Sequence, residues 1–375
     1  MNSISLEQYA EGFRDEPGYL DFARIGPVGR TVRDEEAMQS SILGRARFGT
    51  LEQLDAQDAR VREAVARVLR TSAERVVFQP NTSQGLMHVM FGISGQVLVS
   101  TADFPSLPFV AARAAAATGR LEPVWFTPDH ARITPGAIRD VLTPDIETVG
   151  ISLVDFRTGH LVDLEGIREV VGDRLLVVDS IQGFGVVDAP WELADVVVSG
   201  GQKWVRAGGG TGFMALSDRA LSRIQPVFSG FSATDADGTP LDEVLPPTAG
   251  ARAFQVSNPD RVAEARLAAA LEEIEAVGVQ LISDALTDRV ERIIDFADEF
   301  GIGVLSPRAV TERAGIVVLD PGTDRLTTLA AALHNHGVTA TVRAGSVRLS
   351  PHVTTDEETF AMLRSSLVSF GTSGV

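Results

Sequence analysis

The sequence lacks cysteine altogether and contains a single lysine, and both features restrict its chemistry. With no cysteine among 375 residues, disulfides, thiolate metal sites and a cysteine nucleophile are excluded. Lysine occurs only at position 203, whereas the other 32 of the 33 basic residues are arginine. Arginine cannot replace lysine where a primary amine must lose its proton and form a C=N bond. Lys203 is therefore either a catalytic amine or the one lysine left by a coding bias toward arginine.

Other scarcities argue against several classes of partner. The net charge is −17 and no Lys/Arg-rich run interrupts the acidity, so we expect no nucleic-acid partner. No run approaches the roughly 18–20 apolar residues of a membrane span, and the N-terminus lacks the apolar core of a signal peptide. We therefore expect a cytoplasmic protein that does not bind membranes. The six histidines are scattered without metal-ligand spacing, which predicts no metal site.

Short apolar runs alternate with helical patterns between about residues 55 and 225. The runs show little polar alternation, as expected for strands that are covered on both faces. Alternation of such strands with helices predicts an α/β fold with a mostly parallel sheet between helices. The expected strands are 75–79, 96–100, 121–126, 148–154, 175–180, 195–200 and 212–217.

The character of the chain changes after residue 225. Residues 229–250 are rich in Gly, Pro, Ser and Asp and predict a loop. A long helical pattern follows, and the last 74 residues have the order β-β-α-β-β-α, which predicts a compact second α/β unit. We expect four parts: an N-terminal segment packing with the small domain (1–30), a large domain (31–257), connecting helices (258–301) and a small C-terminal domain (302–375).

Asp179 and Lys203 lie close after two neighbouring predicted strands, in the segment 175–213. Ligands bind beyond the carboxyl ends of strands in an open parallel sheet, so we expect both side chains in one crevice. An amine that forms a C=N bond and an acid that keeps a pyridinium nitrogen protonated suit a pyridoxal phosphate site. The alternative is a buried ion pair, but an arginine would be expected there in this chain.

A cofactor phosphate requires hydrogen-bond donors and a helix N-terminus. Residues 79–85, QPNTSQG, follow a predicted strand and open a helix, so Asn81, Thr82 and Ser83 offer hydroxyl and backbone N–H groups. Taken alone, the same pattern is also typical of an ordinary helix cap.

Three further residues suit such a site. Phe104 follows the strand 96–100 and could stack on a pyridine ring, although it could equally be a core residue. Arg343 and Arg348 lie on adjoining predicted strands, and a fork-shaped guanidinium suits an α-carboxylate. In a chain with this much arginine, either alone is also typical of a surface charge.

Together these segments resemble the class V aminotransferase family of pyridoxal phosphate enzymes. The similarity runs from YLDFARIGPV (19–28) to RLSPHVTTDEETF (348–360), and its most specific part is the D-x-x-Q…Lys pattern. The resemblance implies that Lys203 is the Schiff-base lysine, that Asp179 contacts the pyridinium nitrogen and that Gln182 contacts the ring hydroxyl. It implies Arg348, with Arg343 as the alternative, for the substrate carboxylate. The other implied cofactor contacts are Asn81, Thr82, Ser83, Phe104, Ser199, Gln202 and Asn258.

The resemblance also implies an architecture and an assembly. The fold is fold type I, like aspartate aminotransferase, with a large pyridoxal-phosphate-binding domain around a mostly parallel seven-stranded sheet and a smaller C-terminal α/β domain. The implied assembly is a homodimer with active sites at the subunit interface, and the substrate is an amino acid.

Within the family, two segments are most similar to the kynureninase branch. They are Phe104-Pro105-Ser106, similar to F-P-T, and FQVSNP (254–259), similar to F-R-x-S-N-P. Two positions differ, because Gln202 replaces a tyrosine and Gln182 stands where kynureninases have histidine. A cysteine desulfurase that carries a persulfide is excluded, because there is no cysteine to carry the sulfur.

The sequence leaves the reaction type open. Transamination, cleavage at Cβ or Cγ, and epimerisation all begin with removal of the Cα proton, and transamination is favoured marginally. A nucleotide-binding dehydrogenase predicts a glycine fingerprint after the first strand, which is absent. A non-catalytic cofactor-binding protein would carry an appended partner-binding domain, for which the length leaves no room.

Overall fold

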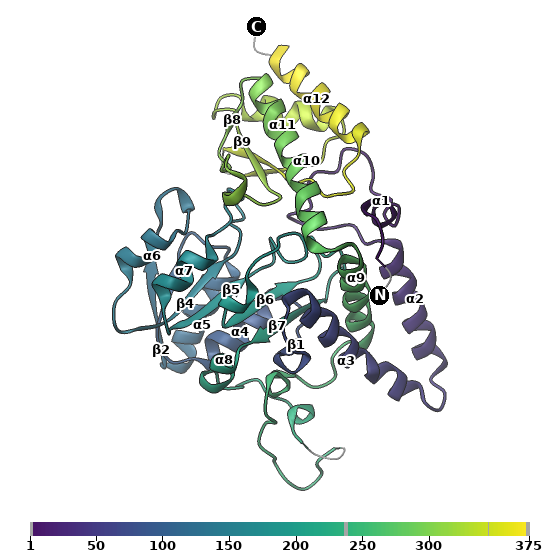
Figure 1. Ribbon diagram of the computed structural model, residues 1–375, viewed down its shortest axis with the longest axis vertical. Helices are drawn as coiled ribbons and strands as arrows, with labels where there is room; N and C mark the ends of the chain where they lie inside the picture. Colours follow the sequence, from purple (N-terminus) through teal and green to yellow (C-terminus); the bar gives the residue numbers. More distant parts are fainter. Residues whose placement is uncertain (1–2, 236–238, 344, 373–375) are drawn as a thin grey trace.

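The predicted apolar runs form one seven-stranded sheet in the computed structural model, which describes residues 3–235, 239–343 and 345–372. Its strand order is β1-β7-β6-β5-β4-β2-β3, and β7 alone runs against the other strands (Figure 1). The predicted mostly parallel α/β sheet is therefore confirmed. The strands are β1 (Val76–Phe78), β2 (Gly95–Ser100), β3 (Leu121–Phe126), β4 (Ile146–Ser152), β5 (Leu175–Asp179), β6 (Val196–Gly200) and β7 (Gly212–Leu216).

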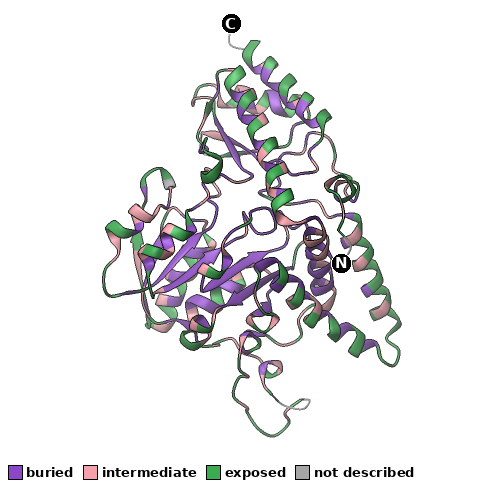
Figure 2. Ribbon diagram, viewed as in Figure 1, coloured by how far each residue is buried: buried purple, intermediate pink, exposed green. Residues whose placement is uncertain are grey.

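Both faces of this sheet are buried, which explains the unbroken apolar runs. Successive side chains of a strand point to opposite faces, and in β5 Val177 belongs to one core whereas Leu176 and Val178 belong to the other. The strands are accordingly buried along most of their length (Figure 2). The helices α4 (Thr82–Gly92), α5 (Ser106–Thr118) and α8 (Asp218–Arg223) supply side chains to the first core, and α6 (Pro135–Val141) and α7 (Leu164–Val171) to the second.

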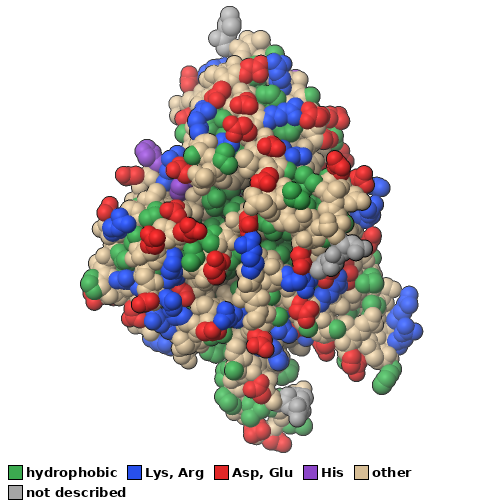
Figure 3. Space-filling view, in the orientation of Figure 1, with side chains coloured by type: hydrophobic (Ala, Val, Ile, Leu, Met, Phe, Trp, Pro, Cys, Tyr) green, Lys and Arg blue, Asp and Glu red, His purple; other side chains and the backbone are tan. Residues whose placement is uncertain are grey.

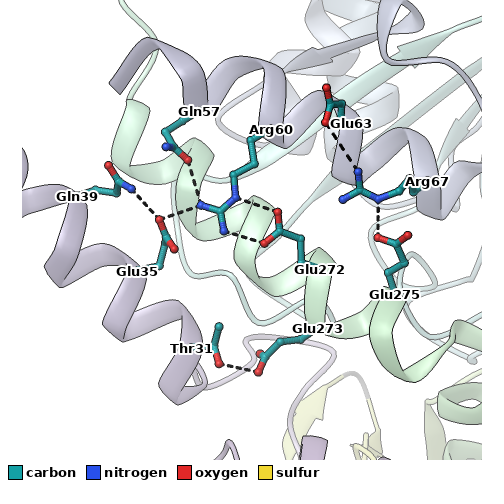
Figure 4. A network of polar contacts seen from close by, with 10 residues as sticks. All are labelled: Thr31, Glu35, Gln39, Gln57, Arg60, Glu63, Arg67, Glu272, Glu273 and Glu275. Carbon is teal, nitrogen blue, oxygen red and sulfur yellow. Dashed lines mark hydrogen bonds and ion pairs between the residues drawn. The ribbon is translucent and has the colours of Figure 1, made fainter. Parts of the chain in front are cut away.

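Three long helices pack side by side at one end of the large sheet, and ion pairs connect them. The helices are α2 (Arg30–Arg45), α3 (Thr50–Leu69) and α9 (Arg261–Val277). Arg60 of α3 donates to both carboxylate oxygens of Glu272 in α9, at 2.9 and 2.7 Å, and to Glu35 of α2 at 2.9 Å (Figure 4). The sequence prediction placed the third helix within the connecting helices 258–301 but did not identify the first two.

The C-terminal part forms a smaller antiparallel sheet with the order β10-β11-β9-β8. Its apolar core is shared with the helices that flank it, and its elements follow the predicted order β-β-α-β-β-α. The elements, with the helix that leads into them, are α10 (Val279–Glu299), β8 (Gly303–Val304), β9 (Val317–Asp320), α11 (Leu326–Asn335), β10 (Thr341–Arg343), β11 (Ser346–Leu349) and α12 (Glu357–Thr372).

The N-terminal segment contacts both units. After α1 (Leu6–Ala10), Tyr19 and Asp21 form bridges with Thr339 and Ser350 of the small unit. Further along, the backbone N–H of Gly26 donates to the carbonyl of Gln202 at 2.8 Å. The segment thus ties the small sheet to the loop that carries the lysine, while the four domain boundaries stay a prediction.

The remaining segments are short or irregular. The predicted loop 229–250 contains one short 3₁₀ segment within its described residues and extends away from the large sheet (Figure 1). Within the described ranges, no helix combines the length and the apolar character needed to span a membrane; the cytoplasmic location stays a prediction. Acidic and basic side chains are interspersed over the face drawn in Figure 3. The 3₁₀ segments are η1 (Ala73–Arg75), η2 (Asp129–Ala131), η3 (Trp191–Leu193), η4 (Phe231–Ala233), η5 (Ala251–Phe254) and η6 (Val310–Glu312).

Candidate active site

Asp179 and Lys203 meet at the carboxyl edge of the large sheet. Asp179 is the last residue of β5, and Lys203 lies in the loop that follows the adjacent parallel strand β6. Both are buried, with 2% of Asp179 and 8% of Lys203 exposed. The charge of each affects the titration of the other. The structure therefore places the amine and the acid in one buried region.

The carboxylate of Asp179 has one occupied and one free oxygen. Its Oδ1 accepts a hydrogen bond from the backbone N–H of Ile181 at 3.0 Å. Its Oδ2 is buried and has no hydrogen-bond partner within the part of the chain that the structure describes. Burial raises the pKa of Asp179, and the charge of Lys203 opposes that shift. A buried oxygen without a donor is costly unless a ligand supplies one.

The amine of Lys203 is held in a form that loses its proton readily. Burial lowers the pKa of Lys203, and the charge of Asp179 opposes this shift; Arg348 and Arg343 lower it further. The Nζ atom lies 5.4 Å from the centre of the Phe104 ring. A desolvated lysine near other cations is a stronger nucleophile and base at neutral pH.

The beginning of α4 lies at the same edge of the sheet, because β1 runs in the direction of β6. Asn81 caps the helix by accepting from the backbone N–H of Gln84 at 2.9 Å. The Thr82 hydroxyl is buried without a hydrogen-bond partner in the described residues, and the Ser83 hydroxyl lies 2.8 Å from that of Ser106. A helix N-terminus with a free hydroxyl suits a phosphate group.

Gln182 contacts the loop that carries Lys203, and both the nitrogen and the oxygen of its side-chain amide form hydrogen bonds. Its Nε2 donates to the carbonyl of Ala23 at 3.0 Å, and its Oε1 accepts from Trp204 Nε1 at 2.9 Å. Ser199 is buried and donates to the carbonyl of Gly200 at 3.2 Å. In these positions Gln182 links the N-terminal segment to the residue that follows the lysine.

The two candidate arginines differ in burial. Arg348 is 5% exposed, and its guanidinium contacts Asp21 Oδ1 at 3.3 Å and the carbonyl of Phe156 at 3.2 Å. Its Nε is buried without a partner within the described residues. Arg343 is exposed, with its guanidinium 5.8 Å from the centre of the Phe156 ring.

Asn258 lies apart from the other candidate residues in this chain. Its backbone is left-handed, with φ 55°, and it lines a separate cavity of about 660 Å³. That cavity is bounded by Gln84 and His88 of α4, and neither Lys203 nor Asp179 lines it. Gln202 is half-buried in the lysine loop, where its carbonyl accepts from Gly26.

Sequence reasoning missed two acidic residues of this site, Asp21 and Asp103. Asp21 contacts Arg348, and Asp103 accepts hydrogen bonds from the backbone N–H and hydroxyl of Ser152 at the end of β4. Burial raises the pKa of Asp103 to about 6. A signal existed for Asp103, because it follows the predicted strand 96–100 directly before Phe104.

A buried lysine, an aspartate with a free oxygen and a helix N-terminus at one carboxyl edge define a pyridoxal-phosphate-dependent enzyme of fold type I. The profile of the family described as aminotransferase class V matches residues 40–373, and the chain belongs to this family. The predicted resemblance is confirmed, and the cofactor of the family is pyridoxal 5'-phosphate.

Two relatives by sequence are moderately similar. A kynureninase of Deinococcus radiodurans is 28% identical over 273 residues, which cover 69% of this chain and 64% of that protein. The alignment thus spans less than two thirds of the kynureninase. The uncharacterized aminotransferase YcbU of Bacillus subtilis is 23% identical over 78% of each chain.

Solved structures are similar over nearly the whole chain. The apo cysteine desulfurase of Thermococcus onnurineus NA1 has a TM-score of 0.85 at 20% identity, covering 97% of this chain and 98% of that one. The cystine C-S lyase C-DES, in complex with cysteine persulfide, has a TM-score of 0.83 at 20% identity, covering 94% and 97%. These likenesses establish the fold, and the relatives together represent more than one reaction.

Proposed function

We propose that the chain is an aminotransferase that uses pyridoxal 5'-phosphate and the amine of Lys203 to act on an amino acid. The observation that carries this proposal is the buried pair of Lys203 and Asp179, in which the Asp179 Oδ2 has no donor among the described residues. An arginine in place of Lys203 could pair with Asp179 but could not form a C=N bond.

The residues present fit the cofactor at three points. Lys203 would hold its aldehyde carbon, Asp179 Oδ2 would accept from its ring nitrogen, and the start of α4 with Thr82 Oγ1 would hold its phosphate. Phe104 would cover the ring, since it lies beside the lysine amine. When bound, pyridoxal phosphate supplies a ring that accepts electrons from the substrate Cα.

The chain's own groups would then move one proton. Lys203 Nζ removes the proton from the substrate Cα, and its lowered pKa leaves part of the amine neutral for this task. Asp179 stays ionised beside a positively charged ring nitrogen, which offsets the cost of its burial. Arg348 orients the substrate through its α-carboxylate, and its contact with Asp21 fixes the guanidinium plane.

Covalent trapping tests the proposal directly. Purified holoenzyme should absorb visible light, and borohydride reduction should fix the cofactor on the peptide that contains Lys203. Because the chain has one lysine, only the N-terminal amine could compete. Lys203→Arg should retain its fold by circular dichroism yet give no reduced adduct. A colourless protein after addition of the cofactor, or an adduct elsewhere, would overturn the proposal.

Cleavage at Cβ is the second candidate reaction, and the similarity of Phe104-Pro105-Ser106 and residues 254–259 to kynureninases favours it. An amino-acid panel, with and without a keto-acid acceptor, separates the reactions. A new amino acid formed only with the acceptor supports transamination. Pyruvate or alanine formed without acceptor supports cleavage, and loss of optical activity alone supports epimerisation.

We also propose a homodimer with active sites at the subunit interface. Large apolar side chains are exposed in two projecting segments, at Phe48 and Leu51 beside the α2–α3 corner and at Leu241 and Val244 in the 229–250 loop. The cavity that contains Asn258 is lined by Ser229 and Gly230, at the start of this loop, and by Asp58 of α3, so it borders both segments. Sedimentation of the wild type should give a dimer, and Leu241→Ser with Val244→Ser should weaken it; a monomeric wild type would contradict this assembly.

A further inference from the structure

Arg343 and Arg348 project from the same face of one β-hairpin. In the register of β10 and β11, Thr341 lies opposite Arg348 and Arg343 lies opposite Ser346. Directly opposed residues share a face, and so do residues two apart along a strand. Arg348 contacts Asp21 from this face, and the charges of both arginines lower the pKa of Lys203. The face is therefore turned toward the site.

Two phenylalanine rings in contact with each other lie between the exposed Arg343 and Lys203. Lys203 Nζ lies 5.4 Å from the Phe104 ring centre, and Phe104 meets Phe156 edge to face at 5.1 Å. Two guanidiniums approach the Phe156 ring, that of Arg157 at 5.4 Å and that of Arg343 at 5.8 Å. A half-buried aromatic ring thus separates the buried amine from two exposed cations.

The guanidiniums of Arg157 and Arg343 have few acidic partners among the residues that the structure describes. Arg348 is engaged by Asp21, whereas Arg343 forms no ion pair with any residue that the structure describes. The nearest carboxylate oxygen to Arg157 belongs to Asp155 at 3.9 Å. The other oxygen of Asp155 accepts three hydrogen bonds from its own loop. In a chain with a net charge of −17, two weakly paired guanidiniums beside the site attract an anion.

We propose that Arg343 and Arg157 bind a second acidic group of the substrate, so that the enzyme acts on amino acids whose side chains end in a carboxylate. Arg348 holds the α-carboxylate, Phe156 packs against the methylene groups between the two acids, and the outer guanidiniums hold the distal carboxylate. This substrate class rests on the proposed function. In this arrangement the buried Arg348 and the exposed Arg343 bind different carboxylates of the substrate.

Binding of unreactive acids to the holoenzyme tests the inference without turnover. Glutarate carries two carboxylates and butyrate one on a chain of similar length, and their affinities can be measured by calorimetry. Because a hydrogen bond to a charged group contributes about 1.5–3 kcal/mol, glutarate should bind about tenfold or more tightly than butyrate. Arg343→Gln and Arg157→Gln should each reduce this preference, with little effect on butyrate; Arg343→Lys should retain part of it.

Arg120→Gln is the matched control, since it removes one exposed positive charge just before β3, at the opposite edge of the sheet. It should retain the preference for glutarate. A wild-type enzyme that binds both acids equally, or an Arg343→Gln variant that keeps the full preference, would overturn the substrate class. Borohydride trapping at Lys203 is measured in parallel. A retained adduct without a dicarboxylate preference refutes this inference alone, whereas a missing adduct refutes the proposed function.

Discussion

The carboxylate of Asp103 connects the carboxyl ends of two strands through Ser152. It accepts from the Ser152 backbone N–H at 3.0 Å and from the Ser152 hydroxyl at 2.5 Å, while the backbone N–H of Phe104 donates to it at 2.8 Å. Ser152 in turn lies opposite Asp179 in the register of β4 and β5. Asp103 therefore fixes the loop carrying Phe104 relative to the strand that carries Asp179.

Replacing Asp103 should have an effect that depends on pH. Burial raises its pKa to about 6 from 3.8, so the folded state holds a proton that the unfolded state has lost between these values. The wild type therefore loses stability as pH rises through this window. Relative to wild type, Asp103→Asn should gain about 2 kcal/mol in unfolding free energy between pH 4 and pH 7, measured with urea. A difference between the two proteins that is constant with pH would contradict the buried, protonated carboxyl.

His88 should cause the opposite dependence. It is 2% exposed, packs edge to face against Phe228 and Phe254, and its Nδ1 has no hydrogen-bond partner within the described part of the chain. Burial lowers its pKa to about 4 from 6.5, so the unfolded state alone gains a proton as pH falls between these values. Stability present above pH 6.5 is then lost on acidification. His88→Gln should remove about 3 kcal/mol of this acid loss, and substitution of the exposed His334 by Gln should not.

Gly26 should not tolerate a side chain, because the N-terminal segment passes directly over the lysine loop. A Cβ atom at this position would lie 2.1 Å from the carbonyl oxygen of Lys203. Gly26→Ala should therefore displace that loop and weaken cofactor binding by tenfold or more, measured by titration of the visible absorption band. Gly209→Ala is the control, since nothing lies within 4 Å of its added Cβ. Equal cofactor affinity in the two variants would refute this close approach.

Arg206 should be the arginine whose loss costs most stability. Its side chain is 1% exposed, pairs with Asp15, and lies 3.7 Å from the centre of the Phe13 ring. Removing one partner of a buried ion pair leaves an uncompensated charge and costs about 3–5 kcal/mol. Arg206→Met should therefore shift the urea midpoint strongly downward. Arg308→Gln, which breaks the exposed pair with Asp298, should change stability by less than about 1 kcal/mol. Equal losses of stability in Arg206→Met and Arg308→Gln would contradict the larger contribution of Arg206.

The sequence predicts the large sheet well because burial on both faces leaves continuous apolar runs, as in 175–179. The placement of Asp179 and Lys203 at one edge follows from strand direction alone. Other features depend on contacts between distant segments. Arg206 looks like any other arginine until the fold brings Asp15 beside it, and Asn258 depends on the path of an irregular loop. Helix α2 buries only Val32 and Gln39 and is tied to α3 by the Arg60–Glu35 pair, so its sequence has little apolar periodicity to detect. Helix α3 does bury Val61, Val65 and Val68, a helical spacing that could have predicted it.

The N-terminal segment also sets an order for the maturation of the protein. The backbone N–H of Ala23 donates to the hydroxyl of Ser350, and Asp21 accepts from Arg348. Each partner lies 327 residues later in the chain. During synthesis the large sheet can therefore form before the segment above the lysine loop has its second anchor. A chain that terminates before β11 would keep every strand of the large sheet, but its N-terminal segment would lack the contacts with Arg348 and Ser350. The second anchor of the segment above the lysine loop therefore forms only after β11 has been synthesised.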